Sequence, residues 1–271
     1  MTITKQNSVE FLVFKNLSDT GIVKHCFSTR KGGVSSGAFA SMNLGYNRGD
    51  DDTNVDENFR RICEAAGLSN KEIVMSKQKH GTNIMEIKEI CDVSGSFTRS
   101  GSLEVPDNTD GLITNHPNIV LATFYADCVP ILLCDPVKRV IANSHAGWRG
   151  CVDNMAALTV KKMTALYGSN PSDILAGIGP CICGSCFEVD EDVAVQFKNE
   201  FGDCVLKAEN KPGKFYIDLR ETCKLSLLGE KIPIENIEIA PCCTYENPDL
   251  FFSHRRDNAL RGSLAAFIEL I

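Results

Sequence analysis

Short apolar runs separated by glycine-rich or polar segments recur along the chain, a pattern typical of a protein with many strands. The runs are rich in Val, Ile, Leu and Phe, and most are too short for helices. We predict strands over residues 21–28, 73–75, 84–87, 119–124, 140–142, 174–178, 237–240 and 250–252.

Helical spacing of apolar residues is clearest over residues 55–66, which follow the capping residues Asp51-Asp52-Thr53 and precede Gly67. Further helices are predicted over residues 152–167, 189–201 and 219–228. Residues 91–109 are polar and rich in Ser and Gly, so we predict a surface excursion there. Together these elements predict a mixed α/β (α+β) fold, a single-domain layered α/β sandwich with mixed sheets over residues 1–271.

Composition and charge narrow the classes of partner. Hydrophobic residues make up 43% of the chain and charged residues 23%, which are ordinary globular values. The net charge of -7 argues against nonspecific binding to nucleic acid or anionic lipid. No apolar run approaches the roughly 20 residues that a transmembrane helix needs, and the start of the chain lacks the pattern of a secretion signal. We therefore expect a cytoplasmic protein with a small-molecule partner, and the sequence does not predict its oligomeric state.

The chain has 13 cysteines, an odd number in a chain that is too long for a disulfide scaffold. We expect reduced, buried thiols in apolar or helical surroundings. This expectation covers Cys26, Cys63, Cys91, Cys134, Cys204 and Cys223.

Two segments, Ala126-Asp127-Cys128-Val129-Pro130 and Ser144-His145-Ala146-Gly147-Trp148-Arg149-Gly150, place a cysteine and a histidine at the ends of apolar runs. Two strands would then deliver both side chains to one edge of a sheet. With His80, which lies in a turn before Gly81, they supply two imidazoles and one thiolate. Three protein ligands with an open position describe a catalytic zinc site. From the residues alone, ordinary core or hydrogen-bonding roles are equally compatible with the pattern.

The whole chain resembles the peptidoglycan editing factor family, also called the multicopper polyphenol oxidase (laccase) family. The resemblance rests on the ADC and HAGWRG segments above and on further matching blocks: residues 27–35, 43–45, 49–51, 78–81, 110–114, 178–180, 187–189, 243–244 and 252–257. It implies a purine nucleoside phosphorylase with adenosine deaminase activity, and it implies His80, Cys128 and His145 as the metal ligands. The chain departs from the family pattern at Leu260-Arg261-Gly262, at His254 and at Asn143-Ser144, and Arg261 receives no role.

Phosphorolysis needs cations or amides that hold inorganic phosphate in line with the sugar carbon. Arg30 and Arg149 are the candidates because both lie in glycine-bearing loops, although each could instead be a solvated arginine. Arg255 and Arg256 are weaker candidates.

Deamination needs a proton carrier, for which Asp127 is the candidate and Glu188 a more distant one. Asp127 could instead be a carboxylate that orients a histidine ligand. Trp148 and Phe187 are candidates for stacking on a base or for plain packing.

A second group of cysteines lies at Cys181, Cys183 and Cys186, with Cys242-Cys243 further on. A zinc or iron–sulfur site is conceivable there. The spacing lacks two chelating pairs, however, so we predict no structural cluster.

The sequence thus predicts a zinc-dependent enzyme that splits purine nucleosides with inorganic phosphate and also deaminates adenosine. Five histidines are too few for a multicopper oxidase, although a single copper at the same three ligands stays open. Two different functions also stay open. One is a hydrolase with Cys128 as nucleophile and His145 or His80 as base, acting on amides of cell-wall precursors, and the second is a non-catalytic binding protein for a nucleotide.

Overall fold

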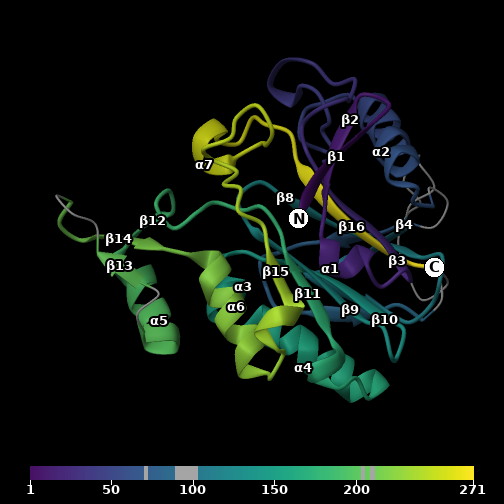
Figure 1. The fold of residues 1–271 in the computed structure, drawn as a ribbon. Coiled ribbons are helices and arrows are strands. Elements are labelled where there is room, and N and C mark those ends of the chain that lie inside the picture. Colours follow the sequence, from purple (N-terminus) through teal and green to yellow (C-terminus); the bar gives the residue numbers. More distant parts are fainter. Residues whose placement is uncertain (70–72, 89–102, 203–204, 208–210) are drawn as a thin grey trace.

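The computed structural model describes residues 1–69, 73–88, 103–202, 205–207 and 211–271. Within them, two large mixed sheets form the centre of the molecule (Figure 1). The first has seven strands, which in spatial order are β1 (Thr2–Gln6), β2 (Val9–Val13), β3 (Val23–Ser28), β16 (Leu264–Leu270), β8 (Val120–Tyr125), β4 (Ile73–Lys77) and β6 (Leu103–Asp107).

The second large sheet has six strands, and a smaller sheet has three. The six are, in spatial order, β15 (Ile237–Ile239), β11 (Leu175–Ile178), β9 (Val129–Asp135), β10 (Val140–Ala146), β7 (Gly111–Thr114) and β5 (Ile84–Glu86). The three are β12 (Glu188–Asp190), β14 (Lys214–Ile217) and β13 (Val205–Lys207).

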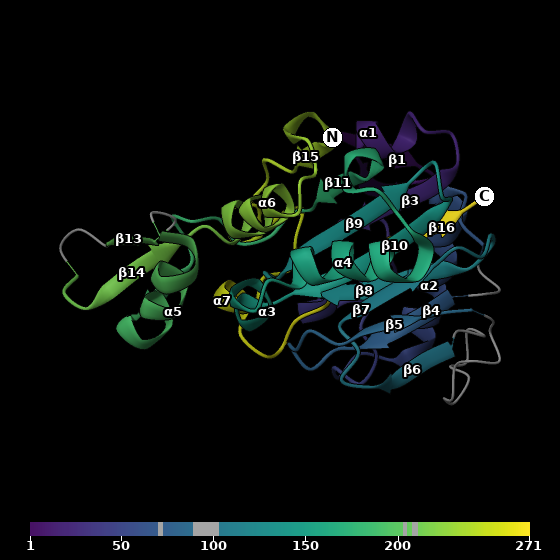
Figure 2. The same cartoon turned by 90° about the horizontal axis from the view of Figure 1, so that it is seen from below.

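The α-helices of the described residues lie around these sheets. They are α1 (Lys15–Ser18), α2 (Asp52–Ala66), α3 (Trp148–Val152), α4 (Met155–Tyr167), α5 (Glu191–Phe201), α6 (Leu219–Gly229) and α7 (His254–Asp257). Helix α2 packs on the seven-stranded sheet, whereas α4 lies across the six-stranded sheet (Figure 2). The result is a mixed α+β sandwich with mixed sheets, as predicted.

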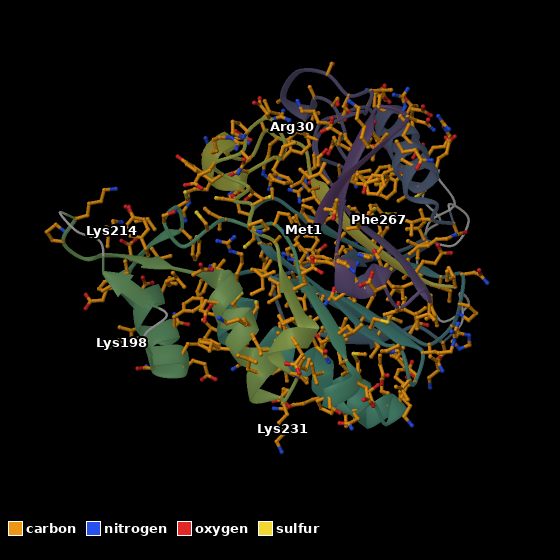
Figure 3. All side chains as sticks on the ribbon, viewed as in Figure 1. Met1, Arg30, Lys198, Lys214, Lys231 and Phe267 are labelled. Carbon is orange, nitrogen blue, oxygen red and sulfur yellow. The ribbon has the colours of Figure 1, made fainter. Side chains whose placement is uncertain are left out.

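Three apolar cores hold these layers together. One lies between the two sheets and joins residues such as Leu121 and Leu264 to Leu132 and Ile141. A second fills the space under α2 and includes Phe267 of β16, which lies among densely packed side chains in Figure 3. The third packs α4 and α6 on the six-stranded sheet. Burial of this apolar surface is the main force that stabilises the sandwich.

Helix α2 follows from its local sequence as predicted. The Asp51 carboxylate accepts a hydrogen bond from the Thr53 amide at 2.8 Å, and Gly67 ends the helix with φ +67°. Val55, Phe59 and Ile62 form its buried face. The helices predicted over residues 152–167, 189–201 and 219–228 are present as α4, α5 and α6, and the short helix α3 before α4 was not predicted.

Three connections pass from the seven-stranded to the six-stranded sheet at the same end of the sandwich. They join β4 to β5, β6 to β7 and β8 to β9. Strand β4 runs parallel to β6 and β8, and β5 runs parallel to β7, so the connections leave and arrive side by side. The end of β10 meets them there, since Ser144 pairs with Gly111 and His145 with Pro130.

Strands β12–β14 and helix α5 form a unit that projects from the sandwich (Figures 1 and 2). Lys198 of α5 and Lys214 of β14 lie on it, far from the central layers (Figure 3). The sequence pattern predicted the helix but none of these strands.

Several predictions need correction. Residues 250–252 form no strand; Phe251 and Phe252 instead fill the core from a loop. Of the predicted surface excursion, residues 91–102 lie outside the described residues, and Leu103–Asp107 is a strand. Strands β1, β2, β7, β9 and β16 were not predicted. Among the described residues, no helix has both the length and the apolar character to cross a membrane.

Candidate functional site

His80, Cys128 and His145 come together where the three connections meet β10. One donor atom from each lies within 4.8 Å of the others, and the two imidazole rings meet edge to face with centroids 4.9 Å apart. His145 is buried, Cys128 half-buried and His80 exposed. The group therefore has one face toward the protein and one toward solvent, which suits a metal with an open position.

The prediction that two strands of one sheet bring Cys128 and His145 to the same edge is wrong. Strand β8, which precedes Cys128, belongs to the seven-stranded sheet, whereas His145 lies on β10 of the six-stranded sheet. His80 and Cys128 lie in two of the connections between the sheets. The site thus lies at the junction of the two sheets, an arrangement that strand patterns alone do not reveal.

Asp110, which was not predicted as a site residue, ties the histidines to each other. It lies in the third connection and is fully buried. Its Oδ1 atom accepts hydrogen bonds from the His80 amide at 2.9 Å and pairs with His145 Nδ1 at 2.9 Å, while its Oδ2 accepts from the amides of Lys79 and Gly81. In the sequence, the available signal for it is an acidic residue directly before Gly111 and the apolar residues Leu112 and Ile113.

The contact with Asp110 orients His145. Because a carboxylate accepts hydrogen bonds, Nδ1 of His145 carries the proton, and Nε2 is left to face the group. Burial by itself would raise the pKa of Asp110, but the hydrogen bonds from His145 and from the amides of Lys79 and Gly81 keep that pKa below its usual value. Asp110 is therefore an anion that fixes a ligand.

Gly147 leaves room for the group. A Cβ at this position would lie 2.6 Å from Cδ2 of His80 and 3.6 Å from the sulfur of Cys128. The first distance is far shorter than a carbon–carbon contact allows. The glycine after Ala146 thus lets His80 pack against the start of α3.

A cavity of about 270 Å³ adjoins the three donors. Apolar and aromatic residues, including Leu44, Tyr46 and Phe124, line part of it. His80, Cys128 and His145 are also part of its wall, together with two arginines, Arg48 and Arg261. Polar side chains such as Ser76, Gln78 and Ser263 line the rest, so the cavity combines apolar surface with polar groups that can orient a small molecule.

Arg261 is a cation to which the sequence pattern assigned no role. Its side chain is only 9% exposed, and its Nε has no hydrogen-bond partner among the described residues. One of its other nitrogens donates to the Gly262 carbonyl at 3.0 Å. Burial lowers the pKa of Arg261, and the charge of Arg48 lowers it further. Lys77 also lines the cavity, where it forms an ion pair with Asp107. Two further cations, Arg48 and Arg261, and the unsatisfied donor of Arg261 favour an anionic ligand.

The Asp127 carboxylate forms hydrogen bonds with the C-terminal segment rather than with a histidine. Its carboxylate accepts hydrogen bonds from the hydroxyls of Thr244 (2.6 Å) and Ser253 (3.0 Å) and from the Arg255 amide (2.7 Å). Its backbone has φ +92°, an unusual conformation for a residue other than glycine. Asp127 thus anchors the C-terminal segment beside Cys128, and the carboxylate that orients a histidine is Asp110.

Arg30 and Arg149, the predicted phosphate ligands, do not line this cavity. The Arg30 guanidinium donates to the carbonyls of Ala40 and Pro248 and lies 4.5 Å from the Phe252 ring centroid. Arg149 is exposed at the start of α3 and lies over the Trp148 ring at 4.2 Å. Arg30 therefore serves loop packing, and the structure does not bring Arg149 to the three donors.

The weaker candidates also lie outside the cavity lining. Arg255 donates to the Glu188 carbonyl and lies over the Phe187 ring, while Arg256 donates to three backbone carbonyls. The Glu188 carboxylate accepts from Lys211 and Tyr216 on the projecting unit. Trp148 and Phe187 pack against the core beneath the six-stranded sheet.

The cysteines fall into two classes. Cys26, Cys63, Cys134 and Cys223 are buried free thiols, as expected, whereas Cys91 and Cys204 lie outside the described residues. Cys183, Cys186 and Cys243 gather with Glu246, with one donor atom of each within 4.8 Å of the others. The prediction of no cluster here rested on spacing, which does not anticipate that two distant loops meet.

Comparisons with known proteins agree with this architecture. A family model described as multi-copper polyphenol oxidoreductase laccase matches residues 24–271. The chain is 36% identical over 244 residues to "Purine nucleoside phosphorylase YlmD" of Bacillus subtilis, covering 89% of this chain and 86% of that protein. It is 31% identical to "Purine nucleoside phosphorylase YfiH" of Escherichia coli, covering 92% and 94%.

Solved structures show the same fold. The structure of "Bacillus licheniformis hypothetical protein YfiH" matches with a TM-score of 0.87 and 32% identity, covering 99% of both chains. YlmD from Geobacillus stearothermophilus matches with a TM-score of 0.87 and 31% identity, covering 98% of this chain and 97% of that one. The chain therefore belongs to the multi-copper polyphenol oxidoreductase laccase family.

Proposed function

We propose that this protein is a zinc-dependent purine nucleoside phosphorylase that also deaminates adenosine. The observation that carries the proposal is a single cavity whose wall contains both the His80, Cys128 and His145 donors and the arginines Arg48 and Arg261. The names of the relatives from Bacillus subtilis and Escherichia coli support the same activity.

Phosphorolysis exchanges one bond at the sugar for another. A phosphate oxygen forms a bond to C1′ of the ribose, the bond from C1′ to N9 of the purine breaks, and the purine leaves with the electron pair and takes up a proton. The chain must therefore hold an anion beside a neutral nucleoside. We assign phosphate to Arg48 and Arg261, because the unsatisfied Nε of Arg261 gains a charge-assisted hydrogen bond.

The apolar part of the cavity wall suits the purine. Phe124 and Tyr46 offer aromatic surface, and both pack against Phe59 of α2, which fixes their rings. A flat base gains stacking energy on such surfaces. The rigid wall would position the sugar carbon relative to phosphate, which is the main contribution a protein makes to a displacement of this kind.

The donor set fits a metal of borderline softness. Two imidazoles and one thiolate are ligands that zinc accepts, and Gly147 leaves space that a Cβ would fill. When bound, zinc would act as a Lewis acid and lower the pKa of a coordinated water. Asp110 would hold His145 with Nε2 toward the ion.

Copper is the alternative metal for the same three ligands. Of the other histidines, His25 is buried and accepts a hydrogen bond from the Phe14 amide, and neither His116 nor His254 lies in the three-donor group. Metal analysis of the purified protein, with oxidation of a phenol as the activity readout for copper, distinguishes the two metals.

For deamination, water adds to the purine carbon that bears the amine, and ammonia leaves after receiving a proton. Asp127 was the predicted proton carrier. Because its carboxylate accepts three hydrogen bonds from the C-terminal segment, we now propose a positioning role for it.

Incubation of zinc-loaded protein with adenosine, with and without inorganic phosphate, tests the proposal. We expect adenine and ribose 1-phosphate only when phosphate is present. Deamination should give inosine and ammonia, and hypoxanthine should appear only when phosphate then splits the inosine. Absence of product from adenosine, inosine, guanosine and methylthioadenosine would contradict the enzyme proposal and favour a nucleotide-binding protein.

A second candidate function uses the same residues without a metal. Cys128, His145 and Asp110 follow one another as nucleophile, base and orienting acid do in cysteine hydrolases, with His145 Nδ1 2.9 Å from Asp110. Such an enzyme would cleave amides, for example in cell-wall precursors. Activity that survives chelation but is lost in Cys128→Ser would favour it over the phosphorylase.

A further inference from the structure

A second group of metal-binding side chains lies outside the cavity. It consists of Cys183, Cys186, Cys243 and Glu246, which we call the three-cysteine cluster. None of the four lines the cavity beside His145. They come from two loops, one after β11 and one after β15. Cys183 and Cys243 lie 60 residues apart in sequence, yet a hydrogen bond joins them.

Backbone contacts hold the two loops together. Cys181 and Cys243 form an isolated parallel bridge, and the Thr244 amide donates to the Cys181 carbonyl at 3.0 Å. The first loop also turns tightly, since the amides of Cys186 and Phe187 both donate to the Cys183 carbonyl at 3.0 Å. The sulfurs are thus brought together by regular backbone interactions within each loop and between the two loops.

The thiols contact polar groups rather than apolar neighbours alone. The Cys183 amide donates to the Cys243 sulfur at 3.3 Å, the Cys183 sulfur lies 3.0 Å from the Ser185 hydroxyl, and the Cys186 thiol donates to the Glu246 carboxylate at 3.4 Å. In contrast, the Cys151 and Cys223 sulfurs lie 3.7 Å apart in the core. Among the described residues, this pair is not part of any group of three or more metal-binding side chains.

The spacing of the donors matches one metal ion. Tetrahedral zinc with sulfur ligands at about 2.3 Å places those sulfurs about 3.8 Å apart. The four donor atoms of the three-cysteine cluster already lie within 4.8 Å of one another. Closing to the bonded distance therefore needs shifts of about 1 Å or less in side chains, of which Cys186 and Glu246 are at least partly exposed.

Electrostatics differ among the three thiols. Burial by itself raises the pKa of the Cys183 thiol, but hydrogen bonds with Ser185, Cys243 and Cys186 outweigh burial and bring that pKa below its ordinary value. In contrast, burial and the neighbouring thiols raise the pKa values of Cys186 and Cys243. A thiolate is the form that binds metal. The guanidinium of Arg220 also interacts favourably with the charge of Cys183.

We propose that Cys183, Cys186, Cys243 and Glu246 form a structural zinc site that clamps the loop after β11 to the loop after β15. Four protein ligands leave no open position, so the ion has no part in catalysis. The clamp holds the segment in which Thr244 bonds Asp127, and Arg256 in turn donates to the Thr244 and Tyr245 carbonyls. The zinc thereby supports the backbone beside Cys128.

The test uses the full chain with the first group of ligands removed. His80→Ala/Cys128→Ser is purified under reducing conditions, equilibrated with an equimolar amount of zinc and desalted. We expect one zinc per chain by elemental analysis. X-ray absorption at the zinc edge should show three sulfurs at about 2.3 Å and one oxygen at about 2.0–2.2 Å.

Matched variants in that background separate the cluster from its neighbours. Cys243→Ser should lose the zinc, whereas Cys242→Ser, one residue away and outside the cluster, should keep it. Glu246→Gln changes an exposed side chain and should fold, with the zinc Kd raised at least about tenfold.

Three results would overturn the proposal. The first is the absence of bound zinc from the His80→Ala/Cys128→Ser protein. The second is zinc that stays bound after Cys243→Ser is added. The third is a mass two hydrogens lower in the reduced preparation, because that would show a disulfide in place of free ligands. None of these results depends on nucleoside cleavage, so they are independent of the proposed enzyme activity.

Discussion

The two groups of metal-binding side chains differ in where the fold places them. His80, Cys128 and His145 lie at the junction of the two large sheets and form part of a cavity wall, with three donors and one exposed member. The three-cysteine cluster joins two loops away from the cavity and has four donors. An incomplete ligand set beside a cavity suits chemistry, whereas a complete set between loops suits stability. Position and ligand number together, rather than cysteine content, distinguish the two roles.

The largest effect on stability should come from the three-cysteine cluster. A zinc ion that binds only the folded state stabilises it by about 4 kcal/mol when free zinc is a thousand times its Kd. In the His80→Ala/Cys128→Ser background, Cys243→Ser should lose this zinc-dependent increment in urea unfolding, and Cys242→Ser should retain it. An equal response of both variants to zinc would remove the distinction between the two groups.

The cavity arginines should dominate phosphate binding. Arg261→Met keeps the apolar stem of the side chain but removes the guanidinium and its charge, and loss of a charge-assisted hydrogen bond costs about 1.5–3 kcal/mol. We expect kcat/KM for phosphate to fall about 10- to 100-fold. Arg149→Met, which changes an arginine outside the cavity lining, is the control. If Arg149→Met has the larger effect, phosphate lies at the start of α3 instead.

Asp110 should matter through His145. Asp110→Asn removes the carboxylate that accepts the hydrogen bond from His145 Nδ1. Loss of a residue that orients a metal ligand lowers metal affinity about 10- to 100-fold. Asp127→Asn is matched to it, because Asp127 also accepts three or more hydrogen bonds but none from a histidine. Zinc titration should show weaker binding at the three-donor site only for Asp110→Asn, while Asp127→Asn should lower the Tm. Equal zinc affinity in both variants would argue against the orienting role.

His25 belongs to neither group and should account for a smaller, pH-dependent effect. Burial lowers its pKa from 6.5 to about 4. Between these values the unfolded chain binds a proton that the folded chain does not, so stability falls as the pH drops below 6.5. The loss by pH 5 should be about 2 kcal/mol. In urea unfolding, the free energy of unfolding of His25→Gln should fall less between pH 6.5 and pH 5. The same pH dependence in His25→Gln and the unsubstituted protein would contradict this role of His25.

Local signals predicted part of the fold well. The cap at Asp51, the apolar face of Val55 and Phe59 and the stop at Gly67 are all contained in a few consecutive residues, so α2 was predicted closely. Strand β16, in contrast, is buried on both faces between β3 and β8, so its sequence shows no alternation of apolar and polar residues. The apolar run at Phe251 and Phe252 resembled a strand but serves as a loop anchor.

The site was predictable only in its residue types. His80, Cys128 and His145 were named from glycine-flanked settings and the family resemblance, and the structure brings them together. Their meeting depends on which strands pair across the two sheets, and that information is not local. The same reason explains why Asp110, Arg261 and the approach of Cys243 to Cys183 were not predicted.

The most direct test of the division between the two groups is phosphate-dependent release of adenine from adenosine by Cys128→Ser and Cys183→Ser. Each variant removes one thiol from one group. We predict no release above background by Cys128→Ser at a temperature where both variants are folded, and release within about tenfold of the unsubstituted protein by Cys183→Ser. Full activity in Cys128→Ser, or equal loss in both variants, would contradict the account.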